Sequence, residues 1–167
     1  MTRYSSKFRI AAPFWLVMAV ILFALSATPA LCYTNSITLT NTQSLAFGSF
    51  IAGSGGTVVV STSGGRSVTS GSIVLMNMNP TAHAAEFNVT GDANAPYTIT
   101  LPADGVVSLT GPGAAMAVGS FTSNPASAGT LNSGGTGTIA VGATLTVGSN
   151  QVPGSYSGSF SVIVVYE

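Results

Sequence analysis

Few side chains in this sequence have the chemistry of an acid–base or nucleophilic catalyst. His83 is the only histidine, and only Asp92 or Asp104 is available to orient it in a Ser-His-Asp arrangement. The G-x-S-x-G pattern of a nucleophile elbow is absent. Because the chain has many serines, one of them could lie close to His83 by chance. The Pro-containing segment 79–82 predicts a solvent-facing loop histidine. We therefore expect no catalytic residue and no enzymatic activity.

The acidic and basic side chains of the chain have simpler interpretations than a metal or ligand site. Glu86, Asp92 and Asp104 are candidates for a glycosidase pair or a calcium site, but Gly91-Asp92 and Asp104-Gly105 are typical of turns. No D-x-[DN]-x-[DN]-G run gathers calcium ligands, and we expect neither a metal nor a cofactor. Arg66 is predicted in a hairpin loop, with an acidic partner or a ligand anion as the alternatives.

The charge balance excludes one class of partner. The chain has 167 residues, enough for one domain, and its formal net charge is zero. Beyond residue 32, however, the one basic residue Arg66 faces four acidic residues, which gives a net charge of −3. Nucleic-acid binding needs several cations to neutralise phosphates, and so it is excluded for this part of the chain.

The N-terminal segment has the pattern of an export signal. Arg3, Lys7 and Arg9 precede an uncharged run over Ile10–Leu25, and small residues follow it. We predict a signal peptide over residues 1–32, cleaved after Ala30 or after Cys32, and a domain over residues 33–167. A retained membrane anchor and a lipid-modified Cys32 are the alternatives. Export to the periplasm, the cell surface or the medium is expected, without an internal disulfide.

Short strands are predicted along the whole domain. Apolar residues alternate with Thr, Ser and Asn, while Gly and Pro interrupt every helical pattern. Turn signals about every 8–12 residues, with no helix for a parallel crossover, indicate an all-β, antiparallel, immunoglobulin-like sandwich. The predicted strands cover residues 36–40, 57–61, 72–78, 86–90, 97–101, 106–110, 116–121, 138–147 and 156–166.

The last predicted strand is the most regular one and is the candidate assembly strand. Its alternate residues share one face, whereas serines line the other face until Ile163 and Val165 make it apolar too. The second half is therefore either buried on both faces or exposed for a partner strand. The candidate assembly residues are Gly154, Tyr156, Gly158, Phe160, Val162, Val164 and Tyr166.

Several motifs between Ile37 and Tyr166 are similar to an uncharacterised family of exported bacterial domains. They are the ending just described and the segments Leu45-x-Phe47-Gly48, Gly65-Arg66-Ser67, Phe87-x-Val89-x-Gly91 and Gly142-Ala143-Thr144-Leu145. More loosely, Gly154 and the penultimate Tyr166 resemble the ending of chaperone–usher fimbrial subunits. That resemblance implies an incomplete sandwich which accepts a strand from a neighbour, with a periplasmic chaperone and an usher as partners.

The sequence thus predicts a structural protein of the bacterial surface that contacts itself or other subunits through strands. The alternative is a non-catalytic adhesin or carbohydrate-binding module, for which Tyr97 and Tyr156 would be stacking surfaces. Contact with a membrane is expected only through the signal segment before cleavage.

Overall fold

The computed structural model describes residues 33–167, which contain twelve strands and no helix. Within these residues no helix is long and apolar enough to span a membrane. The strands are β1 (Thr38–Gln43), β2 (Phe50–Ile51), β3 (Gly56–Val60), β4 (Arg66–Gly71), β5 (Val74–Leu75), β6 (Ala85–Thr90), β7 (Pro96–Thr100), β8 (Val107–Leu109), β9 (Met116–Asn124), β10 (Ala128–Thr130), β11 (Thr136–Val147) and β12 (Ile163–Tyr166).

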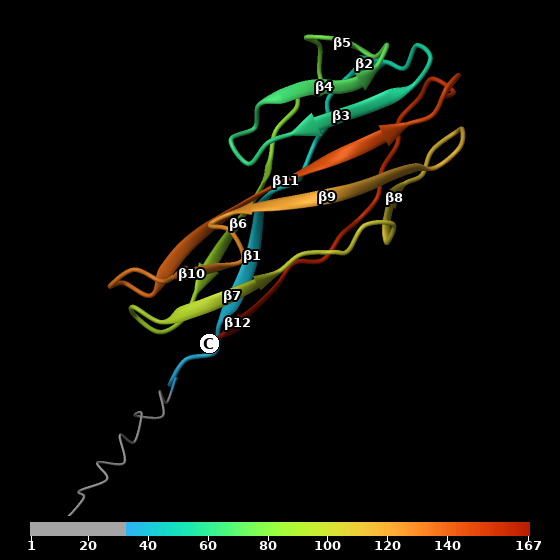
Figure 1. Ribbon diagram of the computed structural model, residues 1–167. Coiled ribbons are helices and arrows are strands. Elements are labelled where there is room, and N and C mark those ends of the chain that lie inside the picture. The colour runs from blue at the N-terminus through green and yellow to red at the C-terminus, as the bar shows by residue number, and fades with distance from the viewer. Residues whose placement is uncertain (1–32) are drawn as a thin grey trace, which may run out of the picture. The chain divides into compact units, whose positions relative to one another are not determined.

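The main sheet is organised around the 12-residue strand β11 (Figure 1). Its first half, residues 136–141, pairs with β6, and its second half, residues 143–147, pairs with β3. Strand β9 pairs with residues 140–145 of β11, while β1, β4 and β8 extend the sheet beyond β6, β3 and β9. At Gly142, where one neighbour replaces the other, a Cβ atom would overlap the Val60 carbonyl oxygen. Glycine thus permits the close backbone approach that the change of partner requires.

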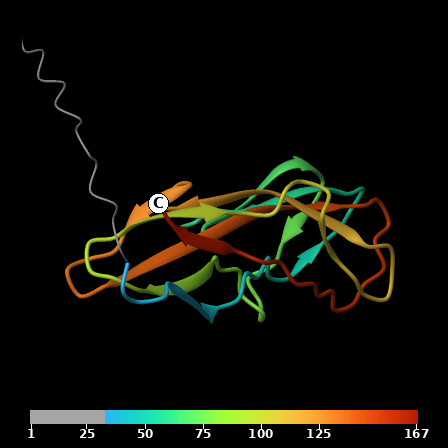
Figure 2. The ribbon, with the colours of Figure 1, turned by 90° about the horizontal axis from the view of Figure 1, so that it is seen from below.

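Two smaller antiparallel sheets complete the described domain. Strands β10, β7 and β12 form one of them with β7 in the centre, and β2 pairs with β5 in the other. Figure 2 shows β7 and β12 running side by side, consistent with their four-residue register from Ile163 opposite Thr100 to Tyr166 opposite Tyr97.

The apolar core consists of two clusters that share three side chains. One cluster contains Val60 and Leu145, and the other contains Tyr97 and Ile139. These residues are at most 1% exposed. The half-buried side chains that pack against both clusters are Leu45, Phe121 and Phe160. Because Phe160 lies three residues before the start of β12, the C-terminal segment is attached to both clusters of the core.

The predicted all-β, antiparallel sandwich is confirmed, although some strand boundaries were wrong. Of the strand predicted over residues 72–78, only β5 forms, and the strands β2, β4 and β10 were not predicted. Arg66 was expected in a hairpin loop, but it is the first residue of β4. The predicted signal segment and its cleavage sites lie outside the described residues.

The stability of the domain should depend on Val141, which is fully buried where β11 contacts both β6 and β9. Val141→Ala removes two buried carbon atoms and leaves a small cavity, so we expect unfolding to cost about 2 kcal/mol less. Urea unfolding measures this free energy. Val106→Ala is the matched control because Val106 is 73% exposed, and a comparable loss there would contradict the assignment of the core.

Candidate functional site

Only the end of the predicted C-terminal strand is a strand. Sequence alternation predicted one strand from Tyr156 to Tyr166, whereas β12 contains only Ile163–Tyr166. The register with β7 would place Ser161 opposite Pro102, and proline has no N–H to donate to a ladder. The prediction of a continuous strand is therefore corrected, and the ladder stops where its neighbour can no longer hydrogen-bond.

The upstream part of the segment packs against the loop that follows β8. Ser157 forms an isolated bridge with Thr110, exchanging N–H···O bonds of 2.8 and 2.9 Å. The Tyr156 hydroxyl accepts a hydrogen bond from Gly113 N and donates one to Val152 O. A Cβ atom on Gly158 would overlap the Ser108 carbonyl oxygen, so this approach requires glycine.

Gly154 lies beside the same loop, since a Cβ atom there would come 2.5 Å from Pro112 Cγ. The first three candidate assembly residues, Gly154, Tyr156 and Gly158, therefore hold the segment on its own domain.

The remaining candidate residues share one face, and this face packs on the core. Val162 and Val164 are half-buried against the second core cluster. Phe160 packs edge-on against Phe87, with ring centroids 6.3 Å apart, and tilted against Phe121 at 5.1 Å. These apolar contacts keep one face of β12 on the core.

Tyr166 joins the end of the chain to the N-terminal arm, defined here as residues 33–37. Its ring stacks on Tyr33 with centroids 3.9 Å apart and an interplanar angle of 16°. Its hydroxyl accepts from Asp92 N at 2.7 Å and donates to Asn35 O at 3.0 Å. A Cβ atom at Gly91 would overlap this hydroxyl, so Gly91 leaves the space that Tyr166 fills.

Asp92 binds the arm from the turn that follows β6. Its carboxylate accepts hydrogen bonds from the main-chain N–H groups of Thr34 and Asn35 and from both of their side chains. Burial raises the pKa of Asp92, but these hydrogen bonds outweigh it and hold the pKa below its ordinary value. Besides the turn role that the sequence predicted, Asp92 therefore has a second role, which is to fix the arm.

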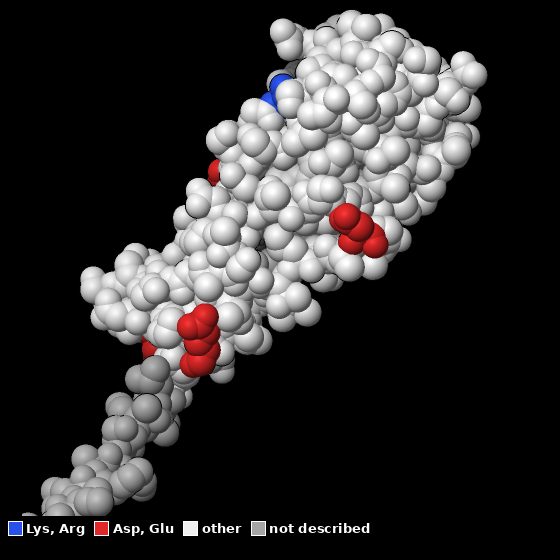
Figure 3. Space-filling view, viewed as in Figure 1, with Lys and Arg blue, Asp and Glu red and all other residues white. Residues whose placement is uncertain are grey.

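The outer face of β12 is apolar and exposed. Ile163 is 56% and Val165 is 49% exposed, and their partners on β7 are the polar residues Thr100 and Thr98. Within residues 33–167, β7 is the only strand that pairs with β12. Figure 3 shows only a few isolated charged side chains on the face in view. The end of the chain therefore combines an open strand edge with two exposed aliphatic side chains.

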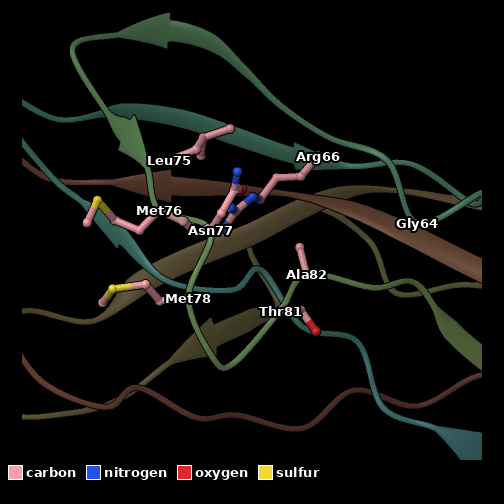
Figure 4. A pocket seen from close by; sticks show the side chains of 8 residues that line it. All are labelled: Gly64, Arg66, Leu75, Met76, Asn77, Met78, Thr81 and Ala82. Atoms are coloured by element: carbon pink, nitrogen blue, oxygen red, sulfur yellow. Dashed lines mark hydrogen bonds between the residues drawn. The ribbon is translucent and has the colours of Figure 1, made fainter.

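Arg66 holds loops together instead of facing an acid. Its guanidinium donates to the main-chain oxygens of Phe47, Ser49 and Met76 at 2.9–3.0 Å. It lines an open pocket of about 450 Å³ with Met76, Met78 and other residues of these loops (Figure 4). Three of its five N–H groups are thereby committed to main-chain carbonyls. This is the role of a structural clamp.

The candidate catalytic residues do not hydrogen-bond to one another. His83 exchanges main-chain hydrogen bonds with Ala46, and its half-buried ring lies 3.4 Å from Ala84 O. Asp104 accepts from Ser120 N, whereas Asp92 binds the arm. Within residues 33–167, no group of three His, Cys, Asp or Glu side chains is placed to hold a metal ion.

Tyr97, which was considered as an exposed stacking surface for carbohydrate, lies in the core instead. It is 1% exposed in the core, and burial raises the pKa of its hydroxyl. Cβ atoms at Gly129 or Gly137 would come within 3.4 Å of the Tyr97 ring or hydroxyl. The absence of side chains at both glycines makes room for it.

A family model described as "Domain of unknown function (DUF4402)" matches residues 37–166. The chain belongs to the DUF4402 family. The match covers all twelve strands but leaves out Tyr33 and Asn35, which hold the terminal tyrosine of the DUF4402 domain. No curated protein and no solved structure matches the chain.

The hydroxyl of Tyr166 should contribute measurably to the stability of the DUF4402 domain. Tyr166→Phe keeps the stack on Tyr33 but removes both hydrogen bonds, and so we expect a loss of about 1 kcal/mol in urea unfolding. Tyr33→Phe is the matched control, because that hydroxyl makes one 3.2 Å contact with Glu167 O at the surface. Equal effects of the two variants would argue against a special role for Tyr166.

Asp92 should make stability depend on pH in the acidic range. Because its pKa is lower in the folded state, its contribution is present above the ordinary Asp value of about 3.9. The contribution is lost as the pH falls through the lower, folded-state pKa. The unfolding temperature, measured between pH 2 and 5, should therefore change less steeply with pH in Asp92→Asn than in the parent. Asn88→Gln, on the exposed face of β6, changes no titrating group and should keep the parent slope.

Proposed function

We propose that this DUF4402 domain is an exported structural protein of the bacterial surface that assembles through strand contacts along the open edge of β12. The observation that carries the proposal is the combination at β12 of a single strand partner within residues 33–167, two exposed aliphatic side chains and no charged residue before Glu167. An open edge of this composition favours pairing with another strand, because main-chain groups and apolar surface are both satisfied by it.

The other outer strands of the described domain offer a poorer edge. β1 has an irregular register between Asn41 and Gln43, and the Asn41 amide donates to the Gln43 and Glu86 carbonyl oxygens. β8 and β10 have three residues each, and β4 contains three exposed polar residues or glycine at its end. Bulges, short length and polar composition are features that prevent edge pairing. The proposal therefore places assembly at β12.

The low charge of the domain supports the same function. With a net charge of −3 beyond residue 32, mutual repulsion between copies is weak. The N-terminal signal pattern supports export, and a chaperone and an usher as partners remain a prediction from Gly154 and Tyr166 alone.

Charges on the outer face of β12 should block assembly without unfolding the domain. The double variant Ile163→Lys/Val165→Lys, expressed as the full chain, is expected to raise the dissociation constant of self-association at least about tenfold, equivalent to about 1.4 kcal/mol. The reason is that each lysine would be placed in an apolar strand contact. Sedimentation velocity measures the association, and thermal unfolding checks the fold.

The matched control is Ile51→Lys/Val74→Lys. This pair is likewise an exposed Ile and Val, 55% and 54% exposed, but the two residues lie opposite each other on β2 and β5. The control should associate as the parent does. Equal loss in both variants, or a parent that stays monomeric at all concentrations and on the cell surface, would refute strand assembly at β12.

A further inference from the structure

We infer that the partner of β12 is β12 of a second copy, paired antiparallel about a two-fold axis at Val164. This inference rests on the proposed function and specifies the strand that fills the open edge. The resulting sheet would run β10-β7-β12 through the axis into β12-β7-β10 of the second copy.

The hydrogen bonds of β7 determine which groups of β12 face the open edge. Ile99 N donates to Ser127 O on the β10 side, whereas Pro96 O accepts from Glu167 N on the β12 side. In an antiparallel pair, hydrogen-bonded and non-hydrogen-bonded positions alternate. Ile163, Val165 and Glu167 therefore point their main-chain groups toward β7. The main-chain groups of Val162, Val164 and Tyr166 point away from β7, and no hydrogen bond within residues 33–167 reaches them.

Only one self-pairing register uses all of these outward groups. With the axis at Val164, this residue is opposite its own copy, and Val162 is opposite Tyr166 once on each side of the axis. These three hydrogen-bonded pairs would form about six main-chain hydrogen bonds. The same register places Ile163 opposite Val165 in two non-hydrogen-bonded pairs, where side chains approach most closely. The two exposed aliphatic residues thus cover each other.

The charges of the segment permit this register. Glu167 would be opposite Ser161, so the two Glu167 residues are separated by six residue steps, about 20 Å along the strands. That distance exceeds the screening length of about 8 Å at physiological ionic strength. An axis at Val165 would instead place Glu167 opposite Ile163 and lose an apolar pair. The composition of β12 therefore favours the axis at Val164.

The N-terminal arm is a poorer donor for the same edge. Its main-chain N–H groups at Thr34 and Asn35 bind Asp92, and Tyr33 stacks on Tyr166 of its own chain. An arm that inserted into a neighbour would have to break these contacts first. A second β12 has no such cost, because its outward groups are already available.

Cysteine pairing between two different variants tests the register. Ile163→Cys and Val165→Cys, each in a Cys32→Ser background, are expressed as full chains and mixed under mild oxidation. The cross-strand pair 163–165 lies at disulfide distance in the proposed register, whereas identical positions are diagonal neighbours about 7–8 Å apart. We expect a covalent dimer on a non-reducing gel from the mixture and from neither variant alone.

The outcomes separate the inference from the proposed function. Disulfide dimers of either variant alone would show a different axis and overturn the inference. Association that depends on Ile163 and Val165 but gives no disulfide in the mixture would overturn the inference and leave strand assembly intact. A strand other than a second β12 would then fill the edge. A mixture that is monomeric by sedimentation and forms no disulfide would refute both. Mixed Ile51→Cys and Val74→Cys, in the same background, measures the background of random collision.

Discussion

The sandwich depends on the ability of β11 to hold three neighbours at once. Its first half pairs with β6, its second half with β3, and its centre with β9 on the other edge. This arrangement requires the backbone of Gly142 to lie against Val60, where a side chain would not fit. Since the described domain has no disulfide and little charge, these ladders and the two apolar clusters on them provide its stability.

The C-terminal segment shows how the same residues can serve the core and a surface. Phe160, Val162, Val164 and Tyr166 keep one face of the chain on the domain, whereas Ile163 and Val165 remain in solvent. Period-two alternation makes this separation unavoidable once the inner face is fixed. The inner-face side chains thereby hold the edge strand on the core, and a partner strand would pair with a strand that is already in place.

Sequence patterns predicted the antiparallel strands well, because alternation and turn residues are local properties. They also predicted which residues of the last segment share a face. They failed for the length of β12, which is limited by Pro102 on a neighbour about sixty residues away in the chain. The contacts of Asp92 and Tyr166 with the arm were missed for the same reason, since spacing within one segment says nothing about distant partners. Arg66 was placed in a loop because Gly64 and Gly65 precede it, and its three carbonyl acceptors come from two other loops that local spacing does not reveal.

The stack of Tyr33 on Tyr166 joins the first described residue to the penultimate residue of the chain. Contacts between residues so distant in sequence form late in folding, because a long loop must close before they are gained. In the export that we propose, Tyr33 would cross the membrane before Tyr166. The stack, and with it the anchoring of β12, would then form only after Tyr166 has crossed, and shorter emerging segments would not present the edge to their neighbours.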